Sequence, residues 1–278
     1  MKLYKTNQGI VVEVNNTFYL SPSRNWDEYI NDDNIVHKVR EELAGLSPDP
    51  NLQQIIDKHI EPPLQSQEIW ACGVTYYRSK VGRQEESKQS GGSEFYARVY
   101  EAERPEIFFK STAARAVGHN GKVNIRKDST WDVPEPELTL MVTSSAKIIG
   151  YTVGNDMSSR SIEGENPLYL PQAKTYDRSA AVGPCIYIPD QPLSPDTLIR
   201  MQVLRNNSVE FEGEVAISQI KRKFEELVFF LFRETSFPHG CLVMTGTGIV
   251  PSSDFTLKEH DVVRITIDNI GTLINTVN

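Results

Sequence analysis

Hydrophobic and polar residues alternate along several stretches of the chain, and this alternation predicts β-strands. Short strands with the sequences KLYKT, GIVVEV and TFYL are expected within residues 2–20, separated by turns that contain asparagine or glycine. In the middle of the chain, residues 138–144 and 147–155 predict two antiparallel strands joined by a tight turn. Further strands are expected at residues 241–247 and 261–277. The pattern therefore predicts a protein that consists mainly of sheet.

Apolar residues at helical spacing predict helices in three regions. Residues 25–43 show a loose helical spacing with a polar interruption, and residues 221–232 form an amphipathic helix that packs on the core. Another helix is expected at residues 93–103, after a polar segment at 80–93 that is expected to be a loop. A loop is also expected around Glu163-Gly164-Glu165, because a glycine separates the two carboxylates.

Proline-rich loops suggest how the chain divides into domains. The run Glu61-Pro62-Pro63 is a strong loop signal and lies between the first strands and helices and the rest of the chain. We therefore expect a small N-terminal α/β domain in residues 1–65 and a catalytic domain in residues 66–278.

Composition excludes several classes of protein. The 278 residues, 39% of them hydrophobic, suffice for a full core. A net charge of −8 argues against nucleic acid as a partner, since phosphate binding needs a basic face. No apolar run has the length of a membrane span and no secretion signal opens the sequence, so the expected location is the cytoplasm. Cys72, Cys185 and Cys241 stand in apolar, strand-like surroundings and are expected to be buried, reduced thiols.

The main candidate for chemistry is a set of three carboxylates. Glu135 and Glu137 stand at the start of a predicted strand, where every second side chain points to the same face. The returning strand ends in Asp156, which an antiparallel pairing brings back to the level of the glutamates. Three oxygen ligands without histidine or cysteine suit a hard cation, Mg²⁺ or else Mn²⁺ or Ca²⁺. From spacing alone, a solvated turn without a metal is an equally good interpretation.

Further motifs favour the metal site. The runs RPEIFFK, PEPELTLMV, GYTVGNDMSSRS, ENPLYLPQAKTYD and TGTGIVP occur in this order, and together they resemble the fumarylacetoacetate hydrolase family from about residue 67 to the C-terminus. The resemblance implies a mixed β-sandwich roll, within an α+β and mainly β fold, and usually a homodimer. It also implies a divalent metal held by Glu135, Glu137 and Asp156 beside Lys174.

One departure from the family pattern bears on the reaction. Many family members carry a histidine shortly after the strand that here ends near Thr75, where it helps a glutamate to activate water. This sequence has no histidine between His59 and His119, which puts hydrolysis in doubt unless Glu85 or Glu86 replaces it. The same runs resemble the branch of 2-keto-3-deoxy-arabinonate dehydratases, in which a glutamate at the place of Glu106 and the downstream lysine form a plausible acid/base pair.

The resemblance thus predicts a Mg²⁺-dependent dehydratase that converts a 2-keto-3-deoxy sugar acid through a metal-stabilised enolate, with 2-ketoglutarate semialdehyde as the product from a pentonate. Lys174 is the candidate base and Glu106 assists the departing hydroxyl, although the order of the two stays open. An acylpyruvate or fumarylacetoacetate hydrolase, an oxaloacetate decarboxylase and a catalytically silent 2-oxo acid binder are the alternatives. Candidate substrate contacts are Thr245, Gly246, Thr247, Arg78 and Gln172.

Overall fold

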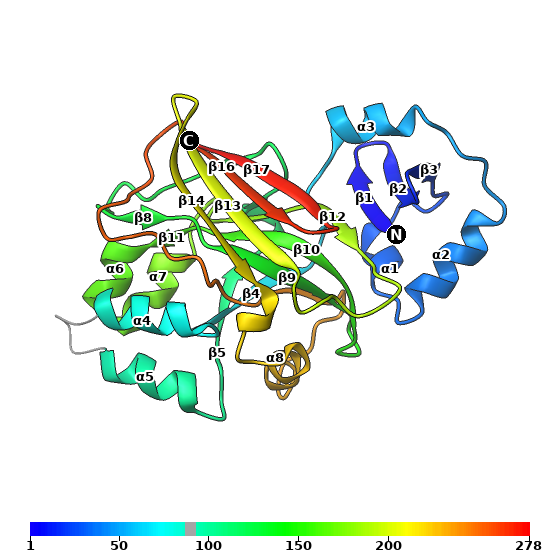
Figure 1. The fold of residues 1–278 in the computed structure, drawn as a ribbon. Coiled ribbons are helices and arrows are strands. Elements are labelled where there is room, and N and C mark those ends of the chain that lie inside the picture. The colour runs from blue at the N-terminus through cyan, green and yellow to red at the C-terminus, as the bar shows by residue number, and fades with distance from the viewer. Residues whose placement is uncertain (87–92) are drawn as a thin grey trace.

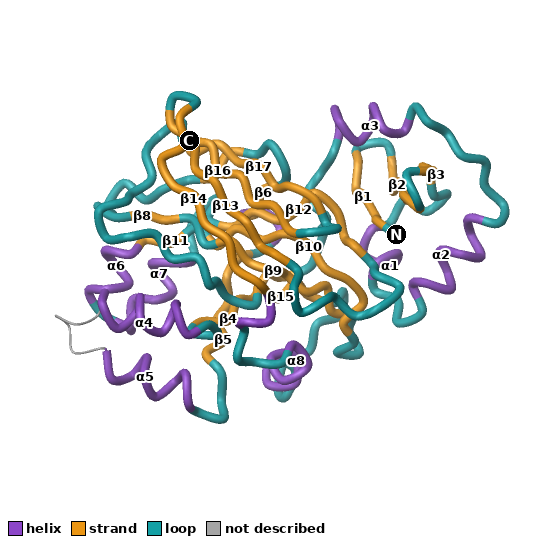
Figure 2. Tube along the Cα trace, in the orientation of Figure 1, coloured by secondary structure: helices purple, strands orange, loops and turns teal. Residues whose placement is uncertain are grey.

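The computed structural model of the chain describes residues 1–86 and 93–278, except for the side chains of residues 85, 86, 93 and 95. Two β-sheets pack against each other in the middle of the molecule, and most helices lie at its two ends and below the sheets (Figures 1 and 2). The predicted fold class, α+β with a predominance of sheet, is confirmed. No helix within the described ranges is long and apolar enough to cross a membrane.

The larger sheet has ten strands in the order β3-β2-β1-β12-β10-β9-β15-β4-β5, with β6 paired to β12. β9 and β10 form the predicted hairpin, and Ala146 adopts a φ of 66° in the turn between them. The strands of this sheet are β1 (Lys2–Thr6), β2 (Gly9–Val14), β3 (Thr17–Leu20), β4 (Glu68–Gly73), β5 (Glu106–Ser111), β6 (Ala116–Val117), β9 (Pro136–Val142), β10 (Ile148–Asp156), β12 (Ala180–Tyr187) and β15 (Cys241–Met244).

The N-terminal strands belong to this same sheet. The three predicted strands are present, and β1 pairs antiparallel with β12, with Lys2 opposite Tyr187 and Leu3 opposite Ile186. Figure 1 shows the N-terminal strands and helices grouped at one end of the molecule. Since backbone pairing continues across this junction, a separate domain in residues 1–65 stays a prediction.

The smaller sheet covers part of one face of the larger one. Its five strands run in the order β14-β13-β16-β17-β7. Leu138 and Val153 from the larger sheet join Met201 and Ile265 from the smaller one in a single buried cluster. The strands are β7 (Lys122–Val123), β13 (Leu198–Arg205), β14 (Ser208–Ala216), β16 (Val262–Ile267) and β17 (Gly271–Val277); β8 (Asp132–Val133) and β11 (Ser158–Ser159) form a separate pair.

Successive side chains of β9 point to opposite faces of the sheet, so Leu138 and Glu137 lie on different faces. Leu138 packs toward the smaller sheet, while Leu140 packs with β15 and the helix at residues 224–231. Glu137 and Met141 point to the opposite face, since side chains two or four apart in a strand share a face. On that face Met141 joins an apolar cluster with the N-terminal helices. The carboxylates therefore lie on the face that the smaller sheet leaves uncovered.

The helices expected at residues 25–43, 93–103 and 221–232 are present, whereas α3, α4, α6 and α7 were not predicted. The segment expected as a loop at 80–93 begins inside α4, and Glu163 lies in α6, so both loop predictions are wrong there. α6 forms because the Ser159 side chain caps its first turn by accepting a hydrogen bond from the backbone of Ile162. As predicted, the three cysteines are buried and unpaired. The helices are α1 (Trp26–Ile30), α2 (Ile35–Leu43), α3 (Leu52–His59), α4 (Tyr77–Glu86), α5 (Ser93–Glu101), α6 (Arg160–Glu165), α7 (Leu170–Lys174) and α8 (Phe224–Leu231).

Candidate active site

The β9–β10 hairpin brings the three predicted carboxylates together. Gly154 lies opposite Glu137, and the backbone N–H of Asp156 donates to the carbonyl of Glu135 over 2.9 Å. One carboxylate oxygen from each of Glu135, Glu137 and Asp156 lies within 4.8 Å of the others, and all three side chains are buried. Because these side chains are buried, the solvated-turn interpretation does not apply. A buried cluster of like charges is unfavourable without a counter-charge.

The end of β15 positions Glu137. The backbone N–H of Gly246 donates to Oε2 of Glu137 over 2.5 Å. Gly246 has a φ of +93°, and a Cβ atom there would collide with the hydroxyl of Thr75, which itself donates to the carbonyl of Thr245 over 2.7 Å. A glycine is therefore required at this turn, and its N–H fixes one carboxylate of the cluster.

Lys174, the last residue of α7, lies among the carboxylates. Its ammonium group donates to Oε2 of Glu135 over 2.7 Å, to Oδ2 of Asp156 over 3.0 Å and to the hydroxyl of Ser158 over 2.6 Å. The Phe108 ring lies 5.7 Å from the ammonium nitrogen. All three ammonium protons thus have acceptors, so Lys174 acts as a donor in this arrangement.

Two arginines that sequence analysis did not single out also reach this cluster. Arg83 from α4 and Arg160 from α6 place guanidinium nitrogens 3.4 Å and 3.3 Å from Oε1 of Glu135. Arg83 also forms a buried ion pair with Glu163. In the sequence, the serine-rich run after Asp156 is a weak indication that Arg160 lies at the site. Arg83 stands in a polar segment that gives no such indication.

Glu106, Phe108 and Lys110 share one face of β5 because they stand two residues apart, and the Phe108 ring and the Lys110 ammonium group lie at the cluster. Glu106 pairs with Gly73 across β4 and β5, and a Cβ atom on Gly73 would collide with its carboxylate. Burial raises the pKa of Glu106 above its usual value, although the positive charges of Arg83 and Lys174 oppose the shift. The structure therefore places the predicted Glu106, half-buried, close to the cluster, although it does not line the cavity.

The predicted substrate contacts fall in different places. Gly246 and Thr247 line the cavity at the carboxylates, whereas the hydroxyl of Thr245 donates to the carbonyl of Leu138 over 2.9 Å inside the sheet. Arg78 and Gln172 are exposed and do not line this cavity. A role in substrate binding stays a prediction for all five. The side chains of Glu85 and Glu86 lie outside the described part of the chain.

The cavity is closely filled by its own side chains. Its free volume is about 10 Å³, roughly the space of one water molecule. Its lining includes Arg83, Arg160 and Lys174, so a metal ion and a substrate can enter only if these cationic groups move off the carboxylates. The complete lining is Cys72, Gly73, Val74, Ser79, Arg83, Phe108, Glu135, Glu137, Asp156, Arg160, Lys174, Gly246 and Thr247.

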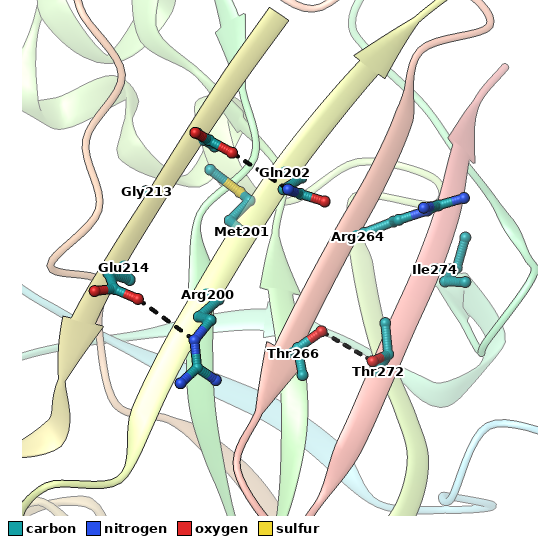
Figure 3. A pocket seen from close by; sticks show the side chains of 10 residues that line it. Arg200, Met201, Gln202, Gly213, Glu214, Arg264, Thr266, Thr272 and Ile274 are labelled. Atoms are coloured by element: carbon teal, nitrogen blue, oxygen red, sulfur yellow. Dashed lines mark hydrogen bonds and ion pairs between the residues drawn. The ribbon is translucent and has the colours of Figure 1, made fainter. Parts of the chain in front are cut away.

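A larger groove of about 720 Å³ lies on the outer face of the smaller sheet, away from the carboxylates (Figure 3). Several of its polar side chains are paired with one another, such as Arg200 with Glu214 at 3.4 Å and Thr266 with Thr272 at 2.9 Å. The groove contains none of the predicted site residues.

The donor set fits a divalent cation. Burial raises the pKa of Glu137 well above its usual value, and the negative charges of Asp156 and Glu135 add to the effect. Burial alone would also raise the pKa of Asp156, but Lys110 and Lys174 hold it below its usual value. A doubly charged ion between the three carboxylates would remove the repulsion that raises the pKa of Glu137, and oxygen ligands suit Mg²⁺.

This fit predicts a pH-dependent stabilisation by Mg²⁺. A carboxyl group whose pKa is raised in the folded state stabilises the fold at low pH and loses that contribution as pH rises. We therefore expect metal-free protein to lose stability from Glu137 above about pH 4, and Mg²⁺ to raise the melting temperature more at about pH 8 than at about pH 5. Thermal unfolding with and without chelator measures this. Metal-free Glu137→Gln should lose less stability over the same range, and equal losses would contradict the assignment.

Comparison with known proteins identifies the family. The family described as fumarylacetoacetate (FAA) hydrolase C-terminal matches residues 75–278, which is most of the chain. The chain belongs to the fumarylacetoacetate hydrolase family. The expected sandwich roll of that family is confirmed by the likeness to the crystal form of a 2-keto-3-deoxyarabinonate dehydratase, with a TM-score of 0.84, 35% identity, and coverage of 100% of this chain and 98% of the other.

The resemblance to the dehydratase branch of the fumarylacetoacetate hydrolase family is confirmed as well. A probable 2-keto-3-deoxyxylonate dehydratase of Haloferax volcanii is 47% identical over 84% of this chain and 81% of its own. A 2-dehydro-3-deoxy-D-arabinonate dehydratase of Saccharolobus solfataricus is 44% identical over 81% of this chain and 76% of its own. A solved 2-keto-3-deoxy-D-arabinonate dehydratase in complex with magnesium and 2,5-dioxopentanoate has a TM-score of 0.83 and 35% identity, and the match covers 100% of this chain and 99% of that one. Family members of this kind are enzymes.

Proposed function

We propose that the protein is a Mg²⁺-dependent dehydratase of a 2-keto-3-deoxy sugar acid. One observation carries the proposal: the buried triad of Glu135, Glu137 and Asp156 lies directly beside Lys174, with Glu106 on β5 of the same sheet. No histidine is found among the described residues that line the cavity, so the water-activating base of a hydrolase has no obvious candidate there. The dehydratase names of similar proteins support the same reaction.

The three carboxylates would hold the metal. When bound, Mg²⁺ supplies a Lewis acid that polarises the carboxylate and 2-oxo oxygens of a 2-oxo acid and so acidifies the C3 protons. Magnesium is favoured by the oxygen-only ligand set and by the complex of the solved relative. Mn²⁺ and Ca²⁺ as substitutes stay predictions.

The hydrogen bonds support a division of labour between Lys174 and Glu106. Because Lys174 already donates all three protons, it is suited to give a proton rather than to take one. Glu106 has a raised pKa and no hydrogen bond to Lys174 in the described structure, and it is suited to accept the C3 proton in its ionised form. The C3–H electron pair then forms the C3–C4 double bond as the C4 hydroxyl leaves, and Lys174 protonates that hydroxyl to water. From a pentonate, the resulting 5-hydroxy-2-oxo-3-enoate then tautomerises to the semialdehyde. This assignment of the two roles reverses the one that the sequence favoured.

An activity assay tests the proposal. Purified protein with Mg²⁺ is offered 2-keto-3-deoxy-pentonates and -hexonates beside an acylpyruvate and oxaloacetate, with and without chelator. Chelator-sensitive formation of a semialdehyde from a pentonate is the expected result. Cleavage of the acylpyruvate or loss of CO₂ from oxaloacetate, without dehydration, would refute the dehydratase and support one of the alternatives. Mg²⁺ binding without any turnover would support a silent 2-oxo acid binder.

Assembly and location are also part of the proposal. The family resemblance supports a homodimer, and the acidic composition supports a protein that binds no nucleic acid. A cytoplasmic location and the lack of a membrane partner stay predictions. Size-exclusion chromatography with light scattering tests the homodimer directly.

A further inference from the structure

Lys110 is a fully buried lysine that the proposed reaction does not use. Its ammonium group lies 2.5 Å from Oδ1 of Asp156 and donates to the backbone carbonyls of Met157 over 2.8 Å and of Lys174 over 2.5 Å. Lys110 does not line the cavity, so it has no contact with the space that a substrate would enter. A buried charge of this kind is costly unless its partners are fixed, and here all three partners lie at the proposed site.

The three contacts connect three elements. Lys110 belongs to β5, Asp156 is the last residue of β10 and Met157 follows it, and Lys174 is the last residue of α7. The contact to Asp156 occupies Oδ1, while Oδ2 faces Lys174 at 3.0 Å. One oxygen of Asp156 is therefore engaged by Lys110, and the other contacts the ammonium group of Lys174, which also contacts Glu135.

We infer that Lys110 is a positioning residue that reserves a single oxygen of Asp156 for the metal and holds Lys174 at the triad. The inference rests on the proposed magnesium site and deepens it. Groups that orient a metal ligand from behind typically contribute tenfold to a hundredfold in metal affinity. The alternative is that Lys110 only neutralises negative charge.

The two roles predict opposite changes in Mg²⁺ affinity for the same variant. Lys110→Met keeps the apolar stem and removes the positive charge. If Lys110 only neutralises charge, its loss removes a cation that competes with the metal, and Mg²⁺ binds more tightly. If Lys110 positions Asp156, Mg²⁺ binds about tenfold to a hundredfold more weakly despite that gain.

Titration calorimetry with Mg²⁺ on the folded variant measures whether the affinity falls or rises. Thr175→Val is the matched control, because the Thr175 hydroxyl donates to the carbonyl of Phe109 over 3.0 Å and so joins the same two elements, β5 and the end of α7, without contacting Asp156. We expect Thr175→Val to bind Mg²⁺ like wild type. Equally weakened Mg²⁺ binding in both variants would mean that Lys110 only links β5 to α7, and this would overturn the inference. Unchanged or tighter Mg²⁺ binding by Lys110→Met would overturn it as well.

Two further measurements keep the test decisive. If Lys110→Met does not fold, Lys110→Arg replaces it: the charge is kept, but a planar guanidinium cannot direct three donors from one atom, and weaker Mg²⁺ binding is again expected. At saturating Mg²⁺ the variant should show a reduced kcat with little change in KM, because Lys174 loses its anchor. Wild-type protein that fails to bind Mg²⁺ would refute the proposed function itself, whereas wild-type binding with an unaffected variant refutes only the role of Lys110.

Discussion

Glu135→Gln is expected to abolish Mg²⁺ binding and to lower kcat/KM for a 2-keto-3-deoxy acid by about a thousandfold or more. Glu135 shares the triad with Glu137 and Asp156 and accepts a hydrogen bond from Lys174, so its charge would both hold the proposed metal and position the lysine. Lewis-acid stabilisation contributes several kcal/mol, and about 1.4 kcal/mol corresponds to a tenfold change in rate. Calorimetry with Mg²⁺ and steady-state kinetics measure the two effects.

Glu165→Gln is the matched control for Glu135→Gln. The same chemical change is made at an exposed glutamate at the end of α6, and neither Mg²⁺ binding nor kcat/KM should change appreciably. If Glu135→Gln retained chelator-sensitive activity near the wild-type level, the triad would not be the metal site. A loss of activity in both variants would point to a general effect of charge.

Glu106→Gln is expected to lower kcat by about a hundredfold to ten-thousandfold, the usual contribution of a positioned acid or base. Mg²⁺ binding should persist, because Glu106 is not one of the three ligands. Retained Mg²⁺ affinity therefore separates this variant from Glu135→Gln. A kcat near that of wild type would exclude Glu106 as the base, and Lys174 would then be the remaining candidate.

Two companion variants sharpen the test of Glu106. Gly73→Ala keeps the carboxylate but adds a methyl group that collides with it, so kcat should fall although no charge is lost. Glu103→Gln alters an exposed glutamate shortly before β5 and should leave kcat unchanged. Normal turnover by Gly73→Ala would show that the position of the Glu106 carboxylate does not matter for the reaction.

The central hairpin and its carboxylates could be predicted because they depend on local pattern. Alternation places Glu135 and Glu137 on one face, and the turn near Ala146 returns the chain so that Asp156 reaches the same level. The pairing of adjacent strands needs no information from distant parts of the chain. Lys174 followed only from the family resemblance, since nothing in its own surroundings distinguishes it from a surface lysine.

Predictions from the local sequence pattern were wrong where contacts between distant parts of the chain decide the structure. The polar segment that contains Arg83 resembles a loop, yet it folds into α4, where the arginine pairs with the buried Glu163. The two residues lie far apart in sequence, so no periodicity could report their contact. The same reason explains why Glu163, next to Gly164, resembled a loop residue and not a buried residue of a helix.

The sequence by itself determined the sheet-rich fold, the hairpin, the three metal-binding candidates and the absence of a histidine at the expected turn. Only the tertiary structure decided which cations surround the triad, that Glu106 lies against Gly73, and that the ammonium group of Lys110 contacts Oδ1 of Asp156. Strand alternation is a property of neighbouring residues, whereas burial, charge pairing and hydrogen-bond partners arise from segments that meet only when the chain folds.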